Sequence, residues 1–198
     1  MSLYPPPKTI KAEVFARVPE GLRKTVRTTW ADINKGGQIC DAFLEGPSFD
    51  RAGNLWVTDI PHGRVFKVSP AGDWTLVTEY DGWPNGLKFH KDGRAFITDY
   101  KRGIMILDPA TGKVTPLIET VRTESFKGVN DLHFASNGDL YFTDQGQTGL
   151  HDPTGRVYRY ATDGRLTCLV NTVPSPNGIV LDLHERVVYV AVTRGNAV

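Results

Sequence analysis

Short runs of apolar and β-branched residues, separated by turns that contain glycine, recur along most of the chain. Residues 55–58, 95–98 and 140–143 are typical of these runs, and their composition predicts buried β-strands. The turn before each run contains Gly or Asn, which accept the positive φ angles that tight hairpins need. No stretch shows a sustained helical period, so the pattern predicts an all-β fold without helices.

One longer pattern repeats four times. A residue with a side-chain oxygen begins a short strand, a turn follows, and a second strand ends in Thr-Asp in the first three copies. A second hairpin follows each of these three copies, and the fourth copy stops at Val198 after about half a repeat. Four strands in 40 to 47 residues are typical of a β-propeller blade, so about 3.5–4 blades are expected. The copies begin at Glu45, Asn85, Asn130 and Asn177.

No shift in composition marks a domain boundary, so residues 1–198 are expected to form a single propeller domain. Residues 1–8 are rich in proline and are interpreted as a flexible lead-in. Residues 9–15 are predicted to form a strand of the kind that completes the last blade of a propeller. An open arc of blades exposes strand edges, so we expect a C-terminally truncated part of a longer protein. The alternative is a complete small propeller of four blades, with residues 9–15 in the fourth.

Propeller topology brings the first residues of the four copies to one face, beside the central axis. We call Glu45, Asn85, Asn130 and Asn177 the axial positions. One carboxylate and three amide oxygens suit a hard cation, so Ca²⁺ is expected, with Zn²⁺, Mn²⁺ or Mg²⁺ as alternatives. The competing interpretation is that Asn-Gly only forms a turn before each strand, which explains Asn85 and Asn177 better than Glu45.

Other polar and aromatic residues fall on the same expected face. His62, His151 and Trp83 are candidates to line a substrate pocket, although surface histidines are more often without a role. Three aspartates end equivalent strands, and this recurrence indicates that they hydrogen-bond to backbone rather than react. They are Asp59, Asp99 and Asp144.

Composition excludes several classes of partner. The chain has 23 Lys and Arg against 22 Asp and Glu, a net charge of +1, which gives no electrostatic reason to bind nucleic acid or an anionic membrane. Its two cysteines form neither a disulfide framework nor a C-x-x-C motif. No apolar segment is long enough for a membrane span or a signal peptide, so a cytoplasmic protein of unspecified oligomeric state is expected.

Three short motifs resemble those of the senescence marker protein 30, gluconolactonase and luciferin-regenerating enzyme (SGL) family. They are residues 45–47 (Glu-Gly-Pro), 130–131 (Asn-Asp) and 176–178 (Pro-Asn-Gly), within a similarity that extends over roughly residues 40–194. The resemblance implies a six-bladed propeller in the intact protein. It also implies a divalent cation held by Glu45, Asn130 and Asn177, together with a fifth-blade Asp beyond the end of this sequence.

The resemblance further implies roles for two neighbouring residues and a type of reaction. Asn85 would lie nearer to the substrate than to the metal, and Asp131 would orient Asn130 from behind. The implied activity is metal-dependent hydrolysis of a lactone, a small-molecule substrate, with the cation polarising the carbonyl group and activating water. Because the fifth-blade carboxylate lies outside the sequence, the 198 residues alone are expected to be inactive.

The sequence departs from the sugar-lactone branch of this family at one position. That branch carries a substrate-gripping Arg two residues before Asn130, where this chain has Gly128 beside Lys127. The resemblance therefore does not extend to an aldonolactone substrate. Two alternatives stay open: a phosphotriesterase-like hydrolase that uses the same metal site, and a non-catalytic binding propeller.

Overall fold

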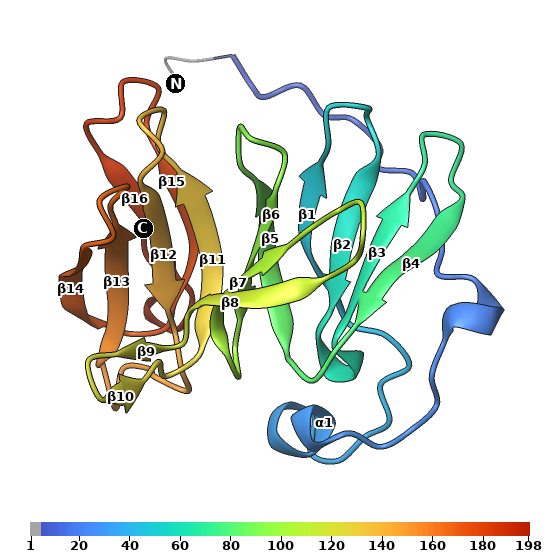
Figure 1. The fold of residues 1–198 in the computed structure, drawn as a ribbon, viewed down its shortest axis with the longest axis horizontal. Helices are drawn as coiled ribbons and strands as arrows, with labels where there is room; N and C mark the ends of the chain where they lie inside the picture. The colour runs from blue at the N-terminus through green and yellow to red at the C-terminus, as the bar shows by residue number, and fades with distance from the viewer. Residues whose placement is uncertain (1–4) are drawn as a thin grey trace.

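The computed structural model describes residues 5–198, which form an arc of antiparallel sheets (Figure 1). The first blade contains β1 (Leu44–Phe49), β2 (Leu55–Asp59), β3 (Arg64–Val68) and β4 (Trp74–Glu79). The second contains β5 (Pro84–Phe89), β6 (Ala95–Asp99), β7 (Gly103–Leu107) and β8 (Val114–Ile118). The third contains β11 (Val129–Phe134), β12 (Leu140–Asp144), β13 (Gly155–Tyr160) and β14 (Leu166–Val173).

Two smaller sheets complete the fold. A two-stranded half-blade follows the third blade, and a short hairpin links the second blade to the third. The prediction of a partial β-propeller is therefore confirmed. The half-blade is β15 (Pro176–Leu181) with β16 (Val188–Val192), and the hairpin is β9 (Thr120–Val121) with β10 (Glu124–Ser125).

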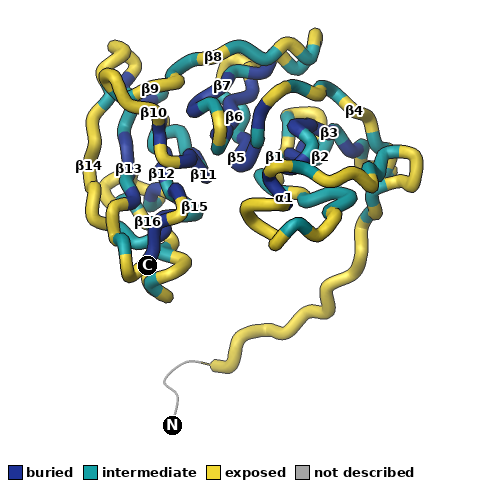
Figure 2. Tube along the Cα trace, turned by 90° about the horizontal axis from the view of Figure 1, so that it is seen from below, coloured by how far each residue is buried: buried dark blue, intermediate teal, exposed yellow. Residues whose placement is uncertain are grey.

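The core lies between neighbouring blades. In Figure 2 the first strand of each blade lies innermost, and β4, β8 and β14 form the outer rim. Between the first two blades, Trp56, Leu87 and Ile97 are buried against one another, and Phe96 and Phe142 anchor the next interface. Because the second strands β2, β6 and β12 bury both faces, their residues are almost continuously apolar up to the Thr-Asp ends.

The structure contains one short α-helix among the described residues, so the predicted absence of helices is wrong. Helix α1 (Thr29–Asn34) lies at the lower end of the first blade in Figure 1, and the Thr28 side chain caps it by accepting a hydrogen bond from the Ala31 N–H (3.2 Å). Trp30 and Ala31 pack against Ile60 and hold the helix on the propeller. Single 3₁₀ turns lie at Glu20–Leu22 (η1), Ile60–His62 (η2) and Thr193–Gly195 (η3).

The predicted strand at residues 9–15 is also wrong. This segment pairs with no other strand of residues 5–198, and Ile10 and Phe15 are 80% and 61% exposed. A strand needs a neighbour to accept its hydrogen bonds, and none lies beside it in the described chain. Of the predicted lead-in, residues 5–8 are exposed, while residues 1–4 lie outside the described residues. No helix among the described residues has the length and apolar character needed to cross a membrane.

Candidate functional site

Each of the four inner strands contains a one-residue irregularity at its axial position. The pairing register shifts between Glu45 and Ser48 in β1, directly after the axial residue, and it shifts across the axial residue in the other three inner strands. A bulge of this kind leaves one residue outside the ladder and redirects its side chain. The repeat therefore places the four axial positions at equivalent points on one face of the arc. The remaining shifts lie between Pro84 and Leu87, Val129 and Leu132, and Pro176 and Ile179.

Contacts between successive blades bring the axial positions together. A Cβ atom at Gly86 would lie 2.8 Å from the Asn130 carbonyl oxygen and 2.9 Å from Asp131 Oδ1, so the second and third blades touch here. Asp131 Oδ2 accepts a hydrogen bond from the Ile179 N–H (3.1 Å), which joins the third blade to the fourth. Asp131 is also near enough to Glu45, on the first blade, to affect its pKa. Contacts thus link the segments at the axial positions from each blade to the next.

Two half-buried carboxylates, Glu45 and Asp131, lie near these positions. Burial raises the pKa of the Glu45 carboxyl, and the negative charge of Asp131 raises it further. Within residues 5–198, neither Glu45 nor Asp131 takes part in an ion pair with Lys or Arg. Withdrawing even part of a carboxylate from water costs free energy unless a cation or strong hydrogen bonds compensate it. The oxygen-rich donor set therefore fits a hard cation.

Amide oxygens would have to complete such a site. The described residues contain no group of three or more His, Cys, Asp or Glu side chains arranged to hold a metal ion. Asn85 and Asn130 are 9% and 7% exposed, so their amides lie within the protein rather than in solvent. Any cation held by the described residues would thus use one or two carboxylates and several amides, a combination typical of Ca²⁺.

Gln145 determines which atom Asn130 presents. Asn130 Nδ2 donates to Gln145 Oε1 (3.0 Å), and Gln145 Nε2 donates in turn to Ser175 Oγ (2.9 Å). With its nitrogen engaged by Gln145, Asn130 offers its oxygen to a ligand. Gln145 is thus the side chain that accepts the hydrogen bond of the Asn130 amide nitrogen, and the role of Asp131 in orienting Asn130 stays a prediction. Gln145 was not identified from the sequence, although it directly follows the Thr-Asp end of β12.

The three strand-end aspartates fix the connections that lead into the site. Each is fully buried, and each accepts a hydrogen bond from the backbone N–H two residues before the axial position of its own blade. This confirms the prediction that they hydrogen-bond to backbone. The pairs are Asp59 with Phe43 (2.7 Å), Asp99 with Trp83 (3.0 Å) and Asp144 with Gly128 (2.8 Å).

The predicted substrate-lining residues lie at varying distances from the axis. His62 and Trp83 line a cavity of about 460 Å³ that includes no axial position, and His62 Nε2 is 3.0 Å from the Cys40 carbonyl oxygen. Trp83 also packs against the α1 cluster of Trp30 and Ile60. His151 is exposed on the loop between β12 and β13. Their role toward a substrate stays a prediction.

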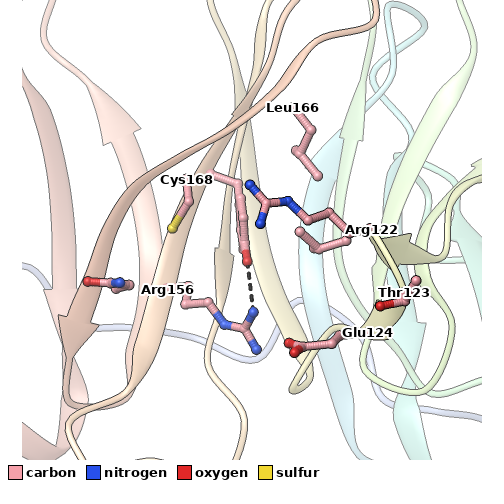
Figure 3. A pocket seen from close by; sticks show the side chains of 9 residues that line it. Arg122, Thr123, Glu124, Arg156, Leu166 and Cys168 are labelled. Atoms are coloured by element: carbon pink, nitrogen blue, oxygen red, sulfur yellow. Dashed lines mark hydrogen bonds between the residues drawn. The ribbon is translucent and has the colours of Figure 1, made fainter.

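A second cavity lies away from the axial positions. Figure 3 shows this space of about 540 Å³ between the β9–β10 hairpin and the outer strands of the third blade. Arg156 Nη1 donates to the Tyr158 hydroxyl (3.0 Å) in its wall, beside Arg122 and the free thiol of Cys168. Since none of the axial positions lines it, cavity size does not identify the functional site here.

The family model described as SMP-30/Gluconolactonase/LRE-like region matches residues 43–198. The chain belongs to this family. It is 34% identical over 176 residues to lactonase drp35 of Staphylococcus aureus strain bovine RF122 / ET3-1, an alignment that covers 84% of this chain and 52% of that protein. The chain thus spans about half the length of the curated relatives it matches.

Two solved structures share the fold of this SGL-family chain. One is a gluconolactonase from Xanthomonas campestris, with a TM-score of 0.70 and 24% identity, covering 79% of this chain and 56% of that one. The other is described as a calcium-binding protein, regucalcin, from Agrobacterium tumefaciens, with a TM-score of 0.63 and 25% identity. That similarity covers 77% of this chain and 51% of the Agrobacterium chain.

The rim of the SGL-family site carries an aromatic ring beside Gly128. Gly128 has φ of +143°, and a side chain there would overlap the Tyr100 ring. Burial raises the pKa of Tyr100 to about 12, so its phenol is neutral at physiological pH, and its oxygen accepts a hydrogen bond from Gln147 Nε2 (3.3 Å). Lys127 points to Thr154 and donates to its hydroxyl. Neither residue 127 nor residue 128 therefore supplies a cation to this part of the rim.

Proposed function

We propose that the intact protein hydrolyses lactones at a divalent-cation site formed by the axial positions. The observation that carries the proposal is the half-buried carboxylate of Glu45, which lies near Asp131 and has no cationic partner among residues 5–198. Membership of the SGL family and similarity to a lactonase support the reaction type. Ca²⁺ is the preferred ion because the donors are hard oxygens and because the Agrobacterium neighbour is described as calcium-binding.

The proposal assigns a role to each residue around the axis. Glu45, Asn130 and Asn177 would hold the cation, and Gln145 would direct the Asn130 oxygen toward it by accepting a hydrogen bond from the amide nitrogen. When bound, the cation supplies Lewis-acid stabilisation of the negative charge that develops on the lactone carbonyl oxygen. Asn85, which is buried on the second blade, would orient the substrate through its amide. A carboxylate that deprotonates the attacking water is expected from a fifth blade.

The surroundings favour an uncharged substrate. A bound divalent cation would offset the negative charges of Glu45 and Asp131, and Lys127 and Gly128 add no positive charge at this part of the rim to pair with a carboxylate or phosphate substituent. The neutral Tyr100 ring occupies the space beside Gly128, where a longer side chain could otherwise grip a substrate. We therefore propose a neutral lactone bound through its carbonyl group rather than through charged substituents.

The test is an assay of the intact protein on a panel of five- and six-membered lactones, with one phosphotriester included. We expect turnover of at least one lactone, its loss when a chelator is added, and its recovery with Ca²⁺. Glu45→Gln should abolish the Ca²⁺-dependent turnover, whereas the exposed Glu119→Gln should leave it unchanged. Turnover of the phosphotriester alone would favour the phosphotriesterase alternative. Absence of turnover on every compound would favour a binding propeller.

A further inference from the structure

Three buried threonines connect the axial positions from one blade to the next. Thr58, Thr98 and Thr143 precede the strand-end aspartates, and all three are fully buried. Each hydroxyl donates to the backbone carbonyl oxygen of the axial Asn in the following blade. The pairs are Thr58 with Asn85 (2.6 Å), Thr98 with Asn130 (2.5 Å) and Thr143 with Asn177 (2.7 Å).

Two of these hydroxyls also accept a hydrogen bond within their own blade. Thr98 Oγ1 accepts from the Gly86 N–H (2.8 Å), and Thr143 Oγ1 accepts from the Asp131 N–H (3.1 Å). Both N–H groups belong to residues that directly follow an axial position and lie in the bulge. A single hydroxyl therefore holds the bulge of one blade and the axial carbonyl of the next.

These contacts determine the direction of the axial side chains. An axial residue lies in a bulge, where no regular ladder fixes its peptide plane. The buried carbonyl needs a donor, and the threonine hydroxyl supplies it from the neighbouring blade. Once the carbonyl direction is fixed, the backbone determines where the Asn amide can point.

We propose that Thr58, Thr98 and Thr143 are positioning residues that set the geometry of the axial site blade by blade. This inference rests on the proposed function. Thr98 and Thr143 act on Asn130 and Asn177, the proposed cation ligands, while Thr58 acts on Asn85, the proposed substrate contact. The equivalent residue of the fourth blade is Ala191, since Val192 pairs with Pro176 as Asp144 pairs with Val129. The last threonine contact of the described chain is therefore the one from Thr143 to Asn177.

The experiment replaces each threonine with valine in the intact protein. Valine keeps the shape of each fully buried side chain and removes its hydroxyl. Thr58→Val should lose less thermal stability than the other two variants, because the Thr58 hydroxyl makes one of these hydrogen bonds and the Thr98 and Thr143 hydroxyls make two each. Calorimetry with Ca²⁺ should separate them: Thr98→Val and Thr143→Val weaken binding by about tenfold or more, whereas Thr58→Val leaves it nearly unchanged and raises KM. Thr98→Ser, which restores the hydroxyl, should recover Ca²⁺ affinity.

The outcomes separate this inference from the proposed function. Wild-type protein that binds no Ca²⁺ would overturn the proposed function, and the positioning role with it. Wild-type binding with equal Ca²⁺ affinities in all three valine variants would overturn the positioning role alone. If a valine variant does not fold, alanine at the same positions replaces it and should show the same order of Ca²⁺ affinities.

Discussion

Glu45 carries a charge that the described residues do not neutralise. Burial and the neighbouring Asp131 both raise its pKa. A carboxyl group whose pKa is higher in the folded than in the unfolded protein contributes stability at low pH and loses it as pH rises through the folded pKa. In the absence of a cation, ionised Glu45 therefore destabilises the fold at neutral pH. Glu45 thus lowers the stability of the cation-free protein while providing a charge that would strengthen the binding of a cation.

Replacing Glu45 with Gln should accordingly have opposite effects on the two forms of the intact protein. Without cation at neutral pH, Glu45→Gln should melt at a higher temperature than wild type because the unpaired charge is gone. With Ca²⁺, the variant should lose the stabilisation that wild type gains. Melting curves in chelator and in excess Ca²⁺ measure both effects.

Asn85→Ala is the matched control for Glu45→Gln. We expect it to weaken Ca²⁺ binding less than Glu45→Gln does, because Glu45 supplies the only charge among the four axial positions. Equal losses of affinity in the two variants, measured by calorimetry, would contradict the division between cation ligands and substrate contacts.

At the scale of elements, strands were predictable and the short helix was not. Each hairpin carries its own signals, namely a run of apolar residues and a glycine turn, so the local sequence was sufficient. Helix α1 spans only six residues, and its Trp30 and Ala31 depend on Ile60 from a distant loop. A helix this short is stabilised mainly by tertiary contacts, which a sequence pattern does not show.

In the candidate site, too, features within one repeat were predictable and contacts between blades were not. The axial positions followed from aligning the repeats, because equivalent residues of a propeller occupy equivalent places. The Thr-Asp ends were visible as well, but Thr98 contacts the carbonyl of Asn130 on another blade. Gln145 has no counterpart in the other repeats that could mark it. Contacts between blades were therefore the part that the sequence left undetermined.

The strand-end aspartates should be important for stability because each holds a connection of its own blade. Asp99 accepts hydrogen bonds from the Trp83, Lys101 and Arg102 N–H groups and from the Tyr80 hydroxyl (2.7 Å). Asp99→Asn keeps one acceptor oxygen but removes the negative charge that strengthens these hydrogen bonds, so we expect the free energy of unfolding to fall by about 2–3 kcal/mol. Urea denaturation measures the change.

Asp92→Asn provides the comparison for Asp99→Asn. Asp92 lies in an exposed turn on the opposite face, where the Arg94 guanidinium lowers the pKa of its carboxyl. Because solvent screens this pair, the substitution should cost less than about 1 kcal/mol. Similar denaturation midpoints for the two variants would show that the buried aspartate does not hold the connection.

At the scale of the whole molecule, the arc has an apolar edge beside the half-blade. A cavity of about 440 Å³ separates the third blade from β16, and its walls are almost entirely apolar. Strand β16 pairs only with β15 among the described residues, and Tyr189 is 47% exposed. An edge strand with exposed apolar residues favours association with another strand. The lining residues are Val157, Leu169, Val170, Val173, Val188, Tyr189, Val190, Val192 and Val198.

We predict that further strands of the intact protein cover this edge, and a substitution at Tyr189 tests the prediction in two contexts. In residues 1–198 expressed alone, Tyr189→Lys should reduce self-association, because a charge on an edge strand opposes pairing between chains. In the intact protein, the same lysine would be buried between strands and should lower the melting temperature. Sedimentation velocity and thermal melting measure the two effects. An intact protein whose melting temperature is unchanged by Tyr189→Lys would show that the edge stays open and that the half-blade is not completed by the rest of the chain.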